Sequence, residues 1–287
     1  MVDRDSRVLV QGITGRLGSR QTELMLEYGT KIVAGVTPGK GGETVHGVPV
    51  YDSVEEALAH HEIDVSVLYV PAPGIKEAAF EAMEAGIKFM VIITDWVPLH
   101  DELEIKALAE RLGTRYIGPN CPGMIIPNEI TLGMLPTSAV APGKVGVVSR
   151  SGTLTGEITQ ILTDAGIGQS CVVGVGGDPV VGMSLRDIVE LYEQDEHTNA
   201  ILIIGEIGGT MEEEAAEYIK DHVSKPVFAF IAGKHAPPEK RMGHAGAIIS
   251  RGRGTAESKI ETLRKAGVKV AESPWDLPKL MREAGIF

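Results

Sequence analysis

The sequence predicts an α/β protein built from doubly wound parallel sheets. Short β-branched runs of about six residues alternate with helical patterns along nearly the whole chain. The runs are apolar without alternation, as in parallel strands that are buried on both faces. Glycine is abundant, with 35 of 287 residues, whereas aromatic residues make up only 5%. That combination favours many tight turns between strands and helices.

In the first half of the chain, the parallel strands are expected at residues 7–12, 31–36, 64–70 and 88–94. The helices between them are expected at residues 18–29, 53–61 and 75–86. The same alternation returns with strands at residues 144–149, 169–175, 199–206 and 225–233. A helix, a strand and a helix over 258–285 close the chain.

Between the two halves the alternation stops at a Pro- and Gly-rich segment, residues 118–143, which we interpret as the connection between two domains. The predicted domains are residues 1–122 and 123–287. A chain of 287 residues is long enough for two domains, each with its own core.

The composition excludes several classes of protein. A formal net charge of −12 disfavours nucleic acid or an anionic membrane surface as the main partner. The two cysteines form no CxxC pair, and no run reaches eighteen apolar residues. The first residues resemble neither a signal nor a transit peptide. A cytoplasmic protein is therefore expected.

The first predicted strand leads into a glycine loop with GxxGxxG spacing, formed by Gly12, Gly15 and Gly18. Backbone N–H groups at such a helix start bind an anion, and glycine lets a phosphate approach. An NAD site would need an acidic residue after the second strand, where this chain has Lys40 instead. NADP or coenzyme A is therefore favoured over NAD.

In the second half, polar or glycine-rich turns follow the strands, and ligands of open α/β sheets bind beyond these ends. His244 stands between Gly243 and Gly246, and Glu206 ends an earlier strand. A carboxylate that orients the ring would make His244 a nucleophile. Nearby cations that would favour anions are Lys240, Arg241, Arg251 and Arg253. No histidine has zinc-ligand spacing, so no metal is expected in this chain.

Eight motifs in order carry a family resemblance: QGITG, GVTPGKGG, YVPAP, IGPNCPG, VGVVSRSGTLT, GGDPV, IGEIGG and RMGHAGAII. With them, nearly the whole chain resembles the alpha subunit of succinate–CoA ligase. The resemblance implies a Rossmann-like CoA-binding domain followed by a flavodoxin-like domain with parallel sheets and helices on both faces. It also implies ligation of an acid to CoA through an acyl phosphate, with His244 relaying the phosphoryl group.

The same resemblance implies a beta subunit with an ATP-grasp fold that binds ATP or GTP and Mg²⁺, in a heterodimer or a heterotetramer. Glu206 would orient His244. CoA would contact Thr14, Gly15, Arg16, Leu17, Lys40, Ile93, Thr94 and Asp95. The phosphate and the acid would lie near Ser151, Gly152, Thr153 and Gly156.

Three departures from the family pattern concern the acid. Trp96 replaces a glycine, Gly156 replaces a tyrosine, and residues 136–138 replace Pro-Gly-His. Succinate is the default acid, with malate or citrate as alternatives. Two further classes stay open at this point, an NADP-binding oxidoreductase and a CoA-binding regulatory protein.

Overall fold

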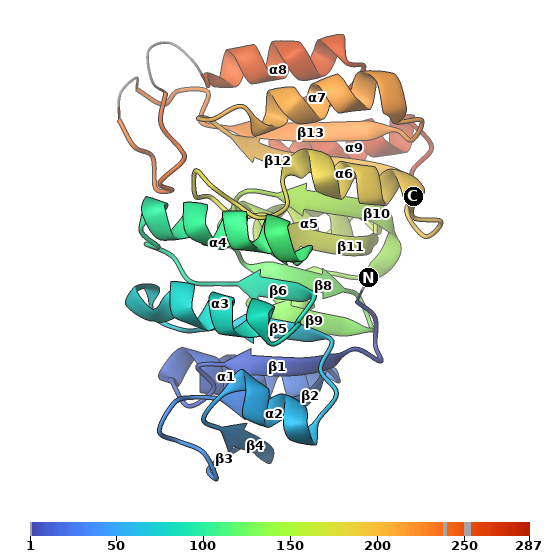
Figure 1. The fold of residues 1–287 in the computed structure, drawn as a ribbon. Helices are drawn as coiled ribbons and strands as arrows, with labels where there is room; N and C mark the ends of the chain where they lie inside the picture. The colour runs from blue at the N-terminus through green and yellow to red at the C-terminus, as the bar shows by residue number, and fades with distance from the viewer. Residues whose placement is uncertain (1, 238–239, 250–253) are drawn as a thin grey trace. The chain divides into compact units, whose positions relative to one another are not determined.

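A computed structural model describes residues 2–237, 240–249 and 254–287. The chain divides into two compact units, Met1–Met134 with Val180–Gly182, and Leu135–Pro179 with Met183–Phe287. Both units contain a mostly parallel sheet with helices (Figure 1), which confirms the predicted fold class.

The sheet of the first unit has the strand order β3-β4-β2-β1-β5-β6-β7. The strands are β1 (Arg7–Gln11), β2 (Lys31–Val36), β3 (Thr44–Val45), β4 (Val48–Tyr51), β5 (Val65–Leu68), β6 (Phe89–Ile92) and β7 (Arg115–Ile117). β1 pairs in parallel with both β2 and β5. The chain therefore winds outward in opposite directions from β1 and β5, and the loops after these two strands flank the point where ligands of such sheets bind.

The helices of this unit are α1 (Arg16–Tyr28), α2 (Val54–His60), α3 (Ile75–Glu84) and α4 (Leu99–Leu112). Ser53 caps α2 by accepting a hydrogen bond from the Glu56 backbone N–H, and α1 ends at Gly29 with φ +102°. The core lies between the sheet and α3 and α4, around Leu68, Met90 and Ile92. Short strands β3, β4 and β7 were not expected, because two to four residues carry too little periodicity to detect.

The sheet of the second unit contains parallel strands in the order β14-β13-β12-β10-β11. These are β10 (Pro142–Ser149), β11 (Gln169–Gly174), β12 (Ala200–Glu206), β13 (Val227–Ala232) and β14 (Lys269–Ala271). The helices are α5 (Gly152–Asp164), α6 (Leu185–Gln194), α7 (Met211–His222), α8 (Ala256–Lys265) and α9 (Leu277–Glu283). Because the order reverses between β10 and β12, the turns after Ser149 and after Glu206 lie side by side.

The segment expected as a connection contains a β-hairpin of β8 (Gly123–Ile126) and β9 (Ile130–Gly133), paired antiparallel. A Cβ on Gly123 would lie 1.9 Å from the Leu132 carbonyl oxygen. Gly123 and Gly133, which the sequence suggested as loop residues, are therefore required because the two strands approach too closely for a side chain. The Thr30 hydroxyl donates to the Thr131 carbonyl at 3.0 Å and fastens β9 to the end of α1.

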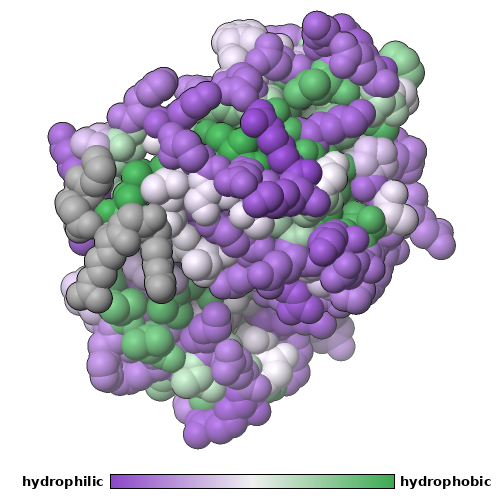
Figure 2. Space-filling model, turned by 90° about the horizontal axis from the view of Figure 1, so that it is seen from above, coloured by the Kyte–Doolittle hydropathy of each residue, from purple (hydrophilic) through white to green (hydrophobic). Residues whose placement is uncertain are grey.

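The face drawn in Figure 2 is mostly hydrophilic, with apolar residues gathered in smaller patches between polar ones. Within the described ranges, the helices are all too short or too polar to cross a membrane.

Candidate functional site

Glu206 and His244 are brought into contact in the second unit. Glu206 is the last residue of β12, and the loop of residues 240–249 lays His244 against it. His244 Nδ1 lies 2.8 Å from Glu206 Oε1 and 2.9 Å from Oε2. The carboxylate side chain is 10% exposed and the imidazole 25% exposed, so the pair is shielded but one edge of the ring reaches solvent.

The loop around His244 is fixed by a backbone contact to the segment that follows β11 and by another within the loop itself. The Gly246 N–H donates to the Gly177 carbonyl at 3.0 Å, and the Met242 N–H donates to the Ala247 carbonyl at 2.9 Å. A Cβ on Gly177 would stand 2.4 Å from His244 Cγ. Gly177 therefore supports the imidazole directly, and the absence of a side chain at this position leaves room for the ring.

The hydrogen bond from His244 to Glu206 favours the protonated form of the ring. It raises the pKa of His244 above the ordinary value, and the negative charges of Glu206 and Asp178 act in the same direction. Burial of the ring and the positive charge of Arg150 act to lower the pKa. With Nδ1 donating to the carboxylate, the neutral ring carries its lone pair on Nε2. This tautomer offers Nε2 as a nucleophile.

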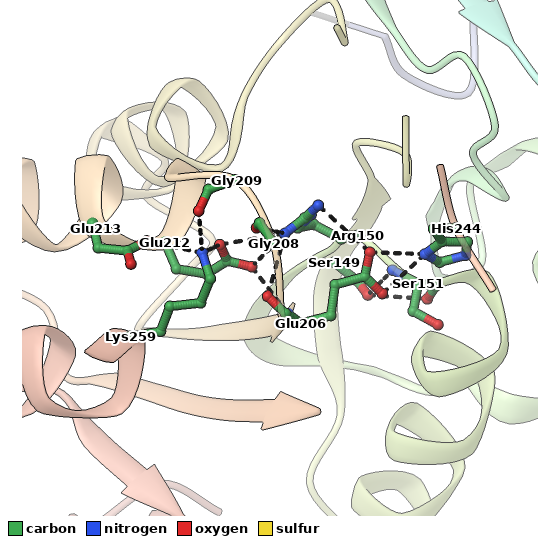
Figure 3. A network of polar contacts seen from close by, with 10 residues as sticks. All are labelled: Ser149, Arg150, Ser151, Glu206, Gly208, Gly209, Glu212, Glu213, His244 and Lys259. Atoms are coloured by element: carbon green, nitrogen blue, oxygen red, sulfur yellow. Dashed lines mark hydrogen bonds and ion pairs between the residues drawn. The ribbon is translucent and has the colours of Figure 1, made fainter. Parts of the chain in front are cut away.

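A chain of buried charges continues behind Glu206 (Figure 3). Arg150 Nη1 lies 3.1 Å from Glu212 Oε1 and donates to the Gly208 carbonyl at 2.9 Å, and Arg150 Nη2 lies 3.6 Å from Glu206 Oε1. Lys259 pairs with Glu212 from the other side. Burial acts to raise the pKa of Glu212, but the charges of Arg150 and Lys259 hold it below the usual value.

Sequence reasoning missed these three residues. Glu212 and Lys259 stand in charged helical stretches that are typical of a solvated face, yet their side chains are 0% exposed. Arg150 did not stand out in the sequence, because it lies between the small polar residues Ser149 and Ser151. The available signal was an arginine directly after a strand whose last five residues, 145–149, are uncharged, a position where a charge is rarely tolerated unless it is paired.

The predicted phosphate-binding residues lie at the start of α5, directly after β10. Ser151 is the N-cap, and its hydroxyl accepts from the Leu154 N–H at 3.3 Å. Gly152 and Thr153 form the first turn, where unpaired N–H groups and the helix dipole favour an anion.

The glycine loop of the first unit follows β1 at the switch point. Gly12 has φ +80°, and a Cβ there would lie 2.9 Å from the Tyr69 carbonyl oxygen. A Cβ on Gly18 would lie 2.2 Å from the Gly12 carbonyl oxygen, so the loop closes tightly against α1. Gly15 is the N-cap of α1, next to Thr14.

Comparison with known proteins follows the same two units. Residues 3–96 match the CoA binding domain family and residues 148–269 match the CoA-ligase family. Over 98% of its length the chain is 55% identical to succinate–CoA ligase [ADP-forming] subunit alpha 1 of Archaeoglobus fulgidus, of which it covers 97%. The chain belongs to the succinate–CoA ligase alpha-subunit family.

Other members of the succinate–CoA ligase alpha-subunit family are similarly close. The alpha subunit of Staphylococcus aureus strain Mu50 is 51% identical over 100% of this chain and 96% of its own. Among solved structures, ATP citrate lyase from Methanothrix soehngenii in complex with citrate and coenzyme A aligns with a TM-score of 0.89 at 25% identity. That alignment covers 100% of this chain and 52% of the lyase chain, so this chain spans about half the length of the lyase.

The residues that the succinate–CoA ligase resemblance assigns to CoA lie at two places in the first unit. Arg16 and Leu17 are exposed in the first turn of α1, and Leu17 is 47% exposed although it is apolar. Lys40 is exposed in the loop after β2, where it pairs with Glu43 at 2.9 Å.

The segment after β6 carries the other residues assigned to CoA. Ile93 is buried, so it can offer a ligand only its backbone, whereas Asp95 is exposed. The Thr94 hydroxyl donates to the Val70 carbonyl at 2.6 Å. This bond ties the segment to the turn after β5.

Two departures from the succinate–CoA ligase pattern have structural consequences. Trp96 has φ +61°, the left-handed region that favours the glycine of the family pattern, and its side chain is 74% exposed. A Cβ on Gly156, in α5, would lie 3.2 Å from Pro136 Cγ, so Pro136 closes over the position where the family has a tyrosine.

Of the cations predicted near His244, Lys240 and Arg241 are exposed on its loop. Arg251 and Arg253 lie outside the described residues.

Proposed function

We propose that this chain is the alpha subunit of an ADP-forming succinate–CoA ligase, which joins succinate to CoA while ATP is converted to ADP and phosphate. The observation that carries the proposal is the contact of His244 Nδ1 with Glu206 at 2.8 Å, at the switch point of the second sheet. The identity of 51–55% with named alpha subunits supports succinate as the acid. Neither the NADP-dependent nor the purely regulatory alternative is favoured by this similarity.

In the proposed mechanism, His244 relays the phosphoryl group. Glu206 accepts the Nδ1–H, and Nε2 attacks the phosphorus of a bound phosphoryl donor. The N–P bond forms as the P–O bond to the leaving group breaks, and the leaving oxygen takes up the bonding electrons. The positive charge on the ring is stabilised by Glu206, and the N-terminus of α5 at Ser151 favours the negative phosphoryl oxygens.

The glycine loop fits a CoA substrate, because Gly12, Gly15 and Gly18 carry no side chain that would keep a phosphate away from the N-terminus of α1. Arg16 and Lys40 supply positive charge, and Leu17 offers an apolar surface. The names of the relatives imply a beta partner. We assign to that partner the ATP-grasp fold, the binding of ATP or GTP with Mg²⁺, and assembly as a heterodimer or heterotetramer, in the cytoplasm.

The proposal is tested by the intact mass of this chain, co-purified with its beta partner and incubated with ATP and Mg²⁺. One added phosphoryl group, lost in mild acid and absent in His244→Asn, is expected. His197→Asn is the matched control, because His197 is an exposed histidine of the same unit and should leave phosphorylation unchanged. Phosphorylation that persists in His244→Asn would refute the relay. The same complex should form succinyl-CoA from succinate, CoA and ATP.

A further inference from the structure

Arg150 is a buried cation held between two carboxylates. It follows β10 directly, and its side chain is 1% exposed. One end of the guanidinium contacts Glu212 at 3.1 Å, and the other approaches Glu206 Oε1 at 3.6 Å. Nη1 also donates to the Glu206 carbonyl at 3.3 Å, so Arg150 holds both the backbone and the side chain of this residue.

Glu212 anchors the guanidinium on the side remote from His244. Its carboxylate contacts Arg150 and Lys259, and it accepts the backbone N–H of Glu206 at 3.0 Å. The Lys259 ammonium also donates to the Gly209 carbonyl at 3.0 Å. A carboxylate that is bound from several directions has little freedom to move. Arg150 is therefore fixed at the end that does not face the histidine.

The carboxylate of Glu206 lies between Arg150 and the imidazole of His244 (Figure 3). We propose that Arg150 is a positioning residue for the phosphohistidine, which holds Glu206 in line with Nδ1 and favours the uncharged, nucleophilic form of His244. This inference rests on the proposed phosphoryl relay and adds Arg150 to the residues that serve it.

The charges around the ring support this role. Glu206, at the end of β12, and Asp178, after β11, both stabilise the protonated ring, and Arg150 opposes them. A carboxylate paired only with His244 would favour the imidazolium form, in which Nε2 carries a proton and has no lone pair to donate. The positive charge of Arg150 partly offsets the negative charge of Glu206. It thereby keeps the pKa of His244 lower than Glu206 alone would make it.

The test uses the complete complex with the beta partner and the variant Arg150→Met. Turnover with succinate, CoA and ATP is measured across pH, together with the phosphohistidine level by intact mass. We expect kcat to fall roughly tenfold or more, because the histidine loses its alignment, with little change in the KM for CoA. The acid limb of the pH profile should move to higher pH, because the His244 ring then stays protonated up to a higher pH.

Lys259→Met is the matched control. It removes an equally buried cation that contacts Glu212 but not the Glu206 carboxylate. Its melting temperature should fall, while the midpoint of its acid limb should stay where the wild type has it. An equal movement of the midpoint in both variants would show a general loss of structure and overturn the assignment to Arg150.

Arg150→Lys covers the case in which Arg150→Met fails to fold. A single ammonium cannot contact both carboxylates as the guanidinium fork does. We therefore expect a smaller fall in kcat and a smaller movement of the midpoint in the same direction. A folded Arg150→Lys or Arg150→Met complex with the wild-type kcat and midpoint would refute the proposal. Failure of the wild type to become phosphorylated would instead refute the relay itself.

Discussion

The variant Gly177→Ala tests, with a single methyl group, how Gly177 supports the imidazole of His244. The added Cβ would stand 2.4 Å from His244 Cγ and 2.5 Å from Nδ1, whereas ordinary contacts begin at 3.4 Å. The ring must therefore retreat by about 1 Å, the difference between 3.4 and 2.4 Å. Such a movement disturbs the Nδ1 contact with Glu206, which is 2.8 Å in the wild type.

A displacement of about 1 Å costs roughly 100-fold in rate, which corresponds to ~2.7 kcal/mol of activation free energy. The assay is rapid quenching of the alpha–beta complex after mixing with ATP and Mg²⁺, with the phosphorylated fraction read from intact mass. We expect slower phosphorylation of His244 and a lower kcat. The affinity for CoA should stay unchanged, because the glycine loop belongs to the other unit.

Alanine has no conformational difficulty of its own at position 177, because no left-handed φ occurs there. We therefore expect urea titration to show a change in unfolding free energy that is much smaller than the increase in activation free energy. Wild-type phosphorylation kinetics in a folded Gly177→Ala complex would show that the loop adapts freely and would refute the reasoning.

The remaining predictions concern the backbone and pH. Trp96→Gly should stabilise the chain by about 0.5–1 kcal/mol in urea unfolding, because a backbone φ of +61° strains a tryptophan. The control Trp275→Gly should not stabilise the chain, because Trp275 is equally exposed but has no positive φ. Gly12→Ala should weaken CoA binding in calorimetric titration, because its Cβ would lie 2.9 Å from the Tyr69 carbonyl oxygen at φ +80°; wild-type affinity would contradict this. The raised pKa of His244 makes its protonation stabilise the fold below the ordinary pKa, and this contribution is lost as the pH rises through the raised value. Urea unfolding of wild type and His244→Asn at several pH values should show it, and parallel pH curves would contradict it.

The central strands, the glycine loop after β1 and the turn after β12 could be predicted from the sequence. Strands such as β1 and β12 contain a continuous apolar run, and glycines follow soon after the carboxyl end of each. Parallel winding then forces the turns after neighbouring strands to one edge. The strands that were missed, β3, β4, β7 and the β8–β9 hairpin, are four residues or shorter, and the helix α4 was not named either. Such short strands carry too few residues for a periodic pattern, although β3–β4 and β8–β9 are antiparallel pairs of strands adjacent in sequence.

By itself, the sequence determined the alternation of strands and helices and the glycine loop after β1, because these depend on local periodicity and on the residue types next to strand ends. It also suggested the pairing of Glu206 with His244 as a hypothesis. Only the tertiary structure decided which charges are buried and what contacts the ring. Arg150, Glu212 and Lys259 come from three separate segments, and their side chains meet because β10 and β12 are neighbours and α8 contacts α7. Gly177 meets His244 from 67 residues away, a contact set by the packing of two loops that no local pattern encodes.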